Sequence, residues 1–257
     1  MGPAFEVQGQ GPTVVFVHNA GTDCGLWAPV VERLVGRFTC VALDLPGFGE
    51  SPAPQDPCLG AYVDAVGQVV DEVGPVAGLV GHCVGGAACW ELVRRRPEVT
   101  RRLVLSAPAT LATMQAGPYG VLQRHLPGHP RRDRVALWLA RAGLGFGPTR
   151  RLVVRSQTRH VTEHLDACHG RADHLESLHG LLHRFDSFGV LDEADARPAV
   201  PTMLLWGRWN RVLPVARMEP VAEVVQPVEE HVLEAGHLAM VDEPGRFADL
   251  VARFVGG

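Results

Sequence analysis

The chain has 257 residues, of which 46% are hydrophobic and 20% charged, so it is long enough to bury one large α/β core. Its formal net charge of −4 gives no electrostatic basis for binding nucleic acid. No apolar run approaches the roughly 18 residues of a membrane span, and the first residues resemble no secretory signal, which predicts a cytoplasmic protein with no membrane partner. The six cysteines lack paired spacing, which favours free thiols over disulfides.

Buried strands and amphipathic helices alternate along much of the chain. Apolar or β-branched runs that end in Gly or Pro predict strand segments at 13–18, 38–52, 76–86, 101–109, 202–207 and 229–237. Apolar residues at helical spacing predict helices at 59–74, at 85–98, near 215–225 and from about 243. Strands separated by helices in this way indicate a mostly parallel sheet with helices on both faces.

The interval from 110 to 195 differs from the rest of the chain. It lacks short buried strands and is rich in arginine, histidine and leucine. An interval of roughly 85 residues is too long for a connecting loop, and helix-like stretches occur within it, for example at 131–143. We therefore predict a helical cap at 110–195, inserted into a core domain formed by 1–109 and 196–257.

The stretch VGHCVGG at 80–86 places Cys83 where the motif G-x-S-x-G has a serine. A strand ends at Gly81, and a helix begins after Cys83. The turn between them is too tight for Cβ atoms at Gly81 and Gly85, and it lifts the side chain of Cys83 above the sheet. The helix N-terminus then favours a thiolate. These features predict a nucleophile, although free cysteines more often serve as small buried core residues.

A histidine and an early loop complete the predicted site. His237 follows a late strand and comes after Cys83 in chain order, as the histidine of such a site requires. An early strand ends in His18-Asn19, where we expect His18 to support the loop. Asn19 tolerates a positive φ, so it can replace the glycine that usually stands there. The N–H groups of Ala20 and Val84 would then form an oxyanion hole.

Five segments together resemble the α/β-hydrolase fold: His18-Asn19, DLPGFGES, GHCVGG, LLWGRWNRVLP and AGH. The resemblance covers about 1–109 and 196–257. It implies a mostly parallel sheet flanked by helices, an inserted helical cap, and a triad of nucleophile, acid and histidine. Asn210 stands where the family has the acid, within W-G-x-x-D. We expect Asn19 and Trp209 to contact the substrate.

The two departures from the family pattern are chemically compatible. Replacing the triad aspartate by asparagine costs a serine protease a factor of about 10⁴ in kcat. A thiol, with a pKa of about 8.5, can instead pass its proton to histidine before the substrate arrives. The third residue then needs only to orient the ring, as asparagine does in papain-like enzymes. This predicts Cys83 as nucleophile, His237 as base and acid, and Asn210 as the residue that orients His237.

Two alternatives to this triad stay open. The chain could be a decayed serine hydrolase that binds a ligand without chemistry, since a fold does not imply a function. An acid could also come from Asp23 or from the cluster at 192–195.

A cysteine nucleophile favours thioester substrates, because attack on a thioester exchanges one thiol for another at little cost. The expected function is acyl transfer from a carrier-protein or coenzyme A thioester, with release by cyclisation or hydrolysis, in secondary metabolism. The chain resembles free-standing thioesterases and the cysteine-dependent Dieckmann cyclases that release polyketide chains. Dienelactone hydrolases also use cysteine in this fold, so a small-molecule esterase or lactonase is the alternative.

The predicted cap carries many arginines and histidines. Nine arginines occur between 110 and 160, at 124, 131, 132, 134, 141, 150, 151, 155 and 159, with one acid, Asp133. They form either a solvated helical face or a dock for an acidic acyl carrier protein or a coenzyme A phosphate. His160 and His164 have helical i, i+4 spacing, but no recognisable ligand set completes the pair. We therefore expect no metal and no cofactor.

Overall fold

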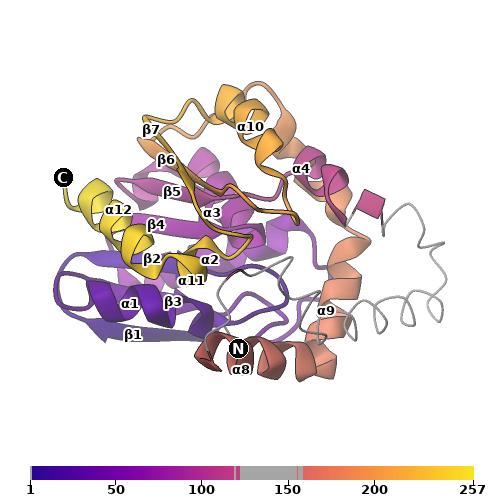
Figure 1. Ribbon diagram of the computed structural model, residues 1–257, viewed down its shortest axis with the longest axis horizontal. Coiled ribbons are helices and arrows are strands. Elements are labelled where there is room, and N and C mark those ends of the chain that lie inside the picture. The colour runs from indigo at the N-terminus through magenta and orange to yellow at the C-terminus, as the bar shows by residue number, and fades with distance from the viewer. Residues whose placement is uncertain (1, 119, 122–154, 156–158) are drawn as a thin grey trace.

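A computed structural model describes residues 2–118, 120–121, 155 and 159–257. A twisted sheet lies at the centre, and helices cover both of its faces (Figure 1). The seven strands are ordered β1-β3-β2-β4-β5-β6-β7 across the sheet. Their bounds are Phe5–Gly9, Thr13–Val17, Thr39–Leu43, Val76–His82, Leu103–Ser106, Thr202–Gly207 and Glu229–Leu233 for β1 to β7.

The mostly parallel sheet that the sequence predicted is confirmed. Every neighbouring pair is parallel except β1 and β3, which are antiparallel. Strand β1 was not predicted. It lies at the edge of the sheet and most of its side chains are exposed, so it lacks the buried apolar run by which the other strands are recognised.

The helices predicted from apolar spacing at 59–74, at 85–98, near 215–225 and from about 243 are present as α2, α3, α10 and α12. The bounds of the described helices are Ala28–Leu34 (α1), Leu59–Val73 (α2), Val84–Arg95 (α3), Leu111–Ala116 (α4), Arg159–Gly170 (α8), Ala172–Leu182 (α9), Met218–Val225 (α10), Ala239–Asp242 (α11) and Pro244–Gly256 (α12). Helix α3 ends before Pro97, as predicted, because proline cannot continue a helix. The short helices α1 and α11 were not predicted from the sequence.

Alternate side chains of each central strand enter two separate apolar cores. In β2, Val14 and Phe16 pack into a core that includes side chains of α1, α11 and α12. Val15 and Val17 pack into the opposite core with α2 and α3. Each central strand is therefore buried on both faces, which explains why these strands appear in the sequence as continuous apolar runs.

In the described part of the polypeptide between β5 and β6, the regular elements are helices. It contains α4, α8, α9 and a 3₁₀ helix, η3 (Phe185–Asp192). Its contacts with the remainder include a hydrogen bond from the N–H of Gly49 to Nε2 of His174 (2.9 Å). The division into a core at 1–109 and 196–257 and a cap at 110–195 stays a prediction. Most of the predicted arginine cluster lies outside the described residues; Arg155 and Arg159 lie within them.

All six cysteines are free, which agrees with the expectation of reduced thiols. Among the helices that the structure describes, none is long and apolar enough to cross a membrane.

Candidate active site

Cys83 occupies a strained turn between β4 and α3. Its backbone has φ 52° and ψ −116°, a conformation that residues other than glycine rarely adopt. A Cβ atom on Gly81 would lie 2.6 Å from the carbonyl oxygen of Gly85, and one on Gly85 would lie 2.5 Å from that of Val17. The predicted turn, too tight for Cβ atoms at both glycines, is therefore confirmed.

Backbone hydrogen bonds hold this turn from several sides. The N–H of Cys83 donates to the carbonyl of Ser106 (3.1 Å). The carbonyl of Cys83 accepts from the N–H groups of Ala87 (3.0 Å) and Ala109 (2.9 Å). These bonds tie the turn to α3 and to the segment after β5, so the surrounding structure can maintain its strain.

The thiol of Cys83 lies in a nearly closed environment, with the residue 5% exposed. Burial raises its pKa to about 12, while the adjacent N–H of Val84 opposes this shift by stabilising the thiolate. A neutral thiol therefore predominates near pH 7 in the structure described here.

His237 is also buried, at 4% exposure, in the segment after β7. Its ring lies 4.6 Å from that of His82, the residue immediately before Cys83. Burial lowers the pKa of His237 well below its usual value, and charge repulsion with His82 lowers it further. Within the described part of the chain, no carboxylate acts on this pKa. The imidazole is therefore neutral.

His82 was not predicted as a site residue. Burial lowers its pKa to about 4, and its Nδ1 contacts the carbonyl oxygen of Ser106 (2.9 Å). Its position inside the motif, one residue before Cys83, was the available signal. The contact with His237 joins residues that are distant in the sequence, so spacing could not reveal it.

Asn210 follows β6, as expected, but it makes no hydrogen bond to His237. Its Oδ1 accepts from the backbone N–H groups of Val212 (3.0 Å) and Leu213 (2.9 Å), which fixes the local turn. Nδ2 of Asn210 and Nδ1 of His237 are both buried and have no partner in the described structure. The predicted role of Asn210 in orienting His237 has no supporting contact in the described structure, because backbone N–H groups occupy its Oδ1.

The loops that carry Asn210 and His237 nevertheless pack together. The N–H of Trp209 donates to the carbonyl of Ala235 (2.9 Å). Any Cβ atom on Gly207 would collide with the carbonyl of Gly236. Trp209 itself is half exposed, and the guanidinium of Arg155 lies 5.5 Å from the centre of its ring.

The loop after β2 differs in one respect from the prediction. Asn19 does not adopt a positive φ; Gly21 does, at 87°. The side chain of Asn19 instead stabilises the loop locally, since Nδ2 donates to the carbonyl of Ala20 (2.9 Å) and Oδ1 accepts from Thr22 (3.0 Å). Ala20 packs against the apolar core that contains Cys83 and Val84. The roles of Ala20 and Val84 as oxyanion donors stay predictions.

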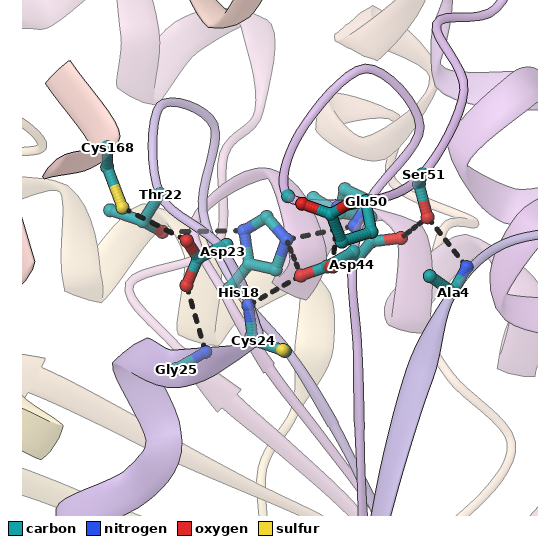
Figure 2. Close-up of polar contacts among 12 residues, drawn as sticks. Ala4, His18, Thr22, Asp23, Cys24, Gly25, Asp44, Glu50, Ser51 and Cys168 are labelled. Atoms are coloured by element: carbon teal, nitrogen blue, oxygen red, sulfur yellow. Dashed lines mark hydrogen bonds and ion pairs between the residues drawn. The ribbon is translucent and has the colours of Figure 1, made fainter. Parts of the chain in front are cut away.

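His18 supports this loop, as expected. Its Nδ1 donates to the carbonyl of Asn19 (2.7 Å), and its Nε2 accepts from the N–H of Leu45 (2.9 Å). Figure 2 shows the ring between the loop and the carboxylate of Asp44. That carboxylate accepts from the N–H of Cys24 (2.7 Å), so the loop and the turn that begins at Asp44 are fixed to each other.

No contact between His237 and the alternative acids, Asp23 and the cluster at 192–195, supports a role for them, and none of them acts on the pKa of His237. Asp23 contacts Cys168 and His164 of α8. Asp192 accepts the N–H of Ala112 at the start of α4 (3.0 Å).

Comparisons with known proteins agree with this architecture. Residues 14–250 match the sequence model described as the alpha/beta hydrolase family. A pimeloyl-[acyl-carrier protein] methyl ester esterase of Methylococcus capsulatus is 30% identical over 266 residues, with 99% of each chain covered.

Two solved structures share the fold at lower identity. A hydrolase from Pseudomonas aeruginosa superposes with a TM-score of 0.79 at 21% identity, covering 99% of this chain and 94% of the other. The enol-lactonase from Burkholderia xenovorans gives a TM-score of 0.74 at 19% identity, covering 99% and 96%. The match of the family model over most of the chain, and the esterase relative along its full length, establish that this protein belongs to the alpha/beta hydrolase family.

Proposed function

We propose that this protein hydrolyses an ester or thioester of an acyl chain through an acyl-enzyme on Cys83. The observation that carries the proposal is the turn at φ 52°, which holds Cys83 at the N-terminus of α3. His237 packs on the adjacent residue, His82. A strained backbone at a helix N-terminus beside a buried histidine is typical of nucleophile sites in this fold.

The esterase relative supports hydrolysis over ring closure. It is named for an acyl chain that is attached to a carrier protein and ends in a methyl ester. The comparisons give no support to cyclisation or to a role in polyketide biosynthesis, so hydrolysis is the favoured fate of the acyl-enzyme. The same relative makes an acyl carrier protein the favoured partner, and the substrate class an acyl ester or thioester borne by that carrier.

The protonation states set the order of events. Because the thiol and the imidazole are both neutral, His237 accepts the Cys83 proton as the sulfur attacks the carbonyl carbon. The N–H groups of Val84 and Ala20 stabilise the oxyanion. The leaving alcohol or thiol takes the proton back from the imidazolium, which leaves a thioester on Cys83. Water, deprotonated by His237, then attacks the acyl carbon of this thioester. The bond between that carbon and the Cys83 sulfur breaks, the imidazolium returns the proton to the sulfur, and the carboxylic acid is released.

This mechanism changes the role that a third residue would play. An imidazolium forms only during attack, so it needs stabilisation at that moment. Asn210 brings no negative charge, and its Oδ1 is already occupied by Val212 and Leu213. We therefore expect slow turnover, limited by formation of the imidazolium.

Alkylation of Cys83 by iodoacetamide should report the neutral resting state. With a thiol pKa of about 12, the thiolate fraction and the alkylation rate should rise with pH throughout the range from 7 to 10, without a plateau. Below the pKa the expected slope is about tenfold per pH unit. Mass spectrometry of the Cys83 peptide measures the rate. A plateau below pH 8 that is lost in His237→Ala would instead demonstrate a pre-formed thiolate–imidazolium pair.

Hydrolysis of a methyl ester and of the matching thioester tests the proposed function. Both should be cleaved to the free acid, and Cys83→Ala should reduce kcat/KM by at least about 10³-fold because the nucleophile is gone. Cys58→Ser is the matched control, since Cys58 is half-buried at the start of α2, and it should leave the rate unchanged. Equal rates for Cys83→Ala and the native protein, or no hydrolysis of any ester or thioester, would contradict the proposal.

Asn210→Asp should increase the rate of hydrolysis. One carboxylate oxygen can keep the bonds to Val212 and Leu213, and the other replaces the unpartnered Nδ2 with a negative charge that stabilises the His237 imidazolium. The asparagine-for-aspartate effect in serine proteases is about 10⁴, so a gain of about tenfold or more in kcat is expected for a thiol. Asn19→Asp adds the same charge in the other loop and should give no gain. An unchanged or lower kcat in a folded Asn210→Asp variant would show that no acid is needed.

A further inference from the structure

A second cluster of reactive side chains lies away from Cys83, where α8 meets the loop after β2. It consists of Asp23 from that loop and of His164 and Cys168 from the helix. We infer that these three residues form a binding site for a divalent transition metal, with zinc as the best fit. This inference goes beyond the proposed hydrolysis and does not depend on it.

The ligand atoms lie close enough together to surround one ion, because one donor atom from each residue can be taken such that all three lie within 4.8 Å of one another. Sγ of Cys168 lies 3.6 Å from Nε2 of His164 and 3.2 Å from Oδ2 of Asp23. Nε2 of His164 lies 3.4 Å from the other carboxylate oxygen of Asp23, Oδ1. Zinc bonds of about 2.3 Å to sulfur and about 2.0–2.1 Å to nitrogen and oxygen imply edges of about 3.6 Å with sulfur and about 3.3 Å without it. A single ion therefore fits between the three groups after a small rotation of the Asp23 carboxylate that turns one oxygen toward both the sulfur and the nitrogen.

The local structure holds the ligands in place. His164 and Cys168 are four residues apart in α8, so their side chains project from the same face. The N–H of Gly25 donates to Oδ1 of Asp23 (3.0 Å), which orients the carboxylate in the way that outer partners orient metal ligands. Gly25 also leaves room for the histidine, because a Cβ atom there would lie 2.9 Å from Cε1 of His164. Figure 2 shows Cys168 directed toward Asp23 from the helix.

The arrangement does not fit a second Cys-His-Asp triad. In such a triad the two ring nitrogens contact different groups, one the nucleophile and the other the acid. Here the same nitrogen, Nε2 of His164, faces both the thiol and the carboxylate. Convergence of a sulfur, a nitrogen and an oxygen on one point is what a metal ion requires.

The donor set selects among metals. One thiolate, one imidazole and one carboxylate suit zinc and its transition-metal neighbours, whereas magnesium and calcium require mainly oxygen ligands. Binding forms a metal–sulfur bond and releases the thiol proton to solvent, so the metal replaces the present contact between Cys168 and Asp23. These three ligands leave a fourth position for water.

The site would connect two functional parts of the molecule. Asp23 lies three residues after Ala20, a predicted oxyanion donor, and His164 and Cys168 belong to the predicted cap. A bound ion would therefore fix α8 against the loop beside the candidate active site. The sequence suggested no metal because spacing paired His164 with His160. The partners of His164 in the structure are Cys168, four residues later in α8, and Asp23 from a distant loop.

Metal titration of the full chain tests the inference. Protein cleared with a chelator is titrated with Co²⁺, which gives a sulfur-to-metal charge-transfer band when bound by thiolate, and then with Zn²⁺ in competition. We expect one ion per chain with a Zn²⁺ Kd of about 1 µM or tighter. At 100 µM Zn²⁺ the Tm should rise by about 5 °C or more.

Ligand and control variants locate the ion. Cys168→Ser, His164→Gln and Asp23→Asn should each weaken Zn²⁺ binding by at least about 100-fold. Asp23→Asn keeps the shape and the bond to Gly25, so its metal-free Tm reports whether the fold is intact. Cys24→Ser, a neighbouring thiol outside the cluster, and Cys83→Ala should bind as the native protein does. No stoichiometric binding, or binding lost in Cys83→Ala and retained in Cys168→Ser, would overturn the site while leaving the hydrolysis assay to be judged separately.

Discussion

The close approach of α3 to the ends of β2 and β4 is the constraint on which the candidate active site depends. The backbone passes so near Val17 and His18 that Gly85 has no space for a Cβ atom, and Gly81 is confined in the same way by Gly85. The chain can satisfy this approach only by turning sharply at Cys83, which takes the positive φ that results. The same turn directs the N–H groups at the start of α3 toward the sulfur. Strain, orientation and the predicted oxyanion donor thus share one cause.

Burial sets the protonation states of the candidate site before a substrate binds. Three buried polar atoms in the described structure lack partners at or beside the site: Nε2 of His82, Nδ1 of His237 and Nδ2 of Asn210. Unpartnered buried polar atoms are rare in folded proteins, and they gather where a ligand or a reaction completes them. The neutral thiol and the neutral imidazole belong to the same picture, because neither charge is favourable until a substrate brings compensating groups. Cysteine and asparagine in place of serine and aspartate therefore keep an active-site geometry while removing its permanent charge.

The fold was predictable from the sequence because each central strand is buried on both faces and appears as an apolar run. The exposed edge strand β1 lacks that run and was missed.

In the candidate site, Cys83 and its two glycines were predictable because the motif is local. The place of His237 was predictable because chain order restricts it. Three contacts were not predictable. They are the contact of His82 with His237, the hydrogen bonds from Val212 and Leu213 to Asn210, and the contact of Cys168 with Asp23. Each depends on side-chain directions between segments that only the folded sheet brings together. Asn19 shows a local limit as well: its residue type permits a positive φ, but Gly21 takes that role.

The central claim is that Cys83 carries the acyl group during the reaction, and intact-mass analysis after brief exposure to an acyl-thioester surrogate tests it most directly. The account predicts a mass increase of one acyl group on the native protein, located to Cys83. It also predicts a longer-lived adduct in His237→Ala acylated by a reactive surrogate, because water is then no longer activated. Absence of any adduct on Cys83 while the native protein still hydrolyses the same surrogate would contradict the account.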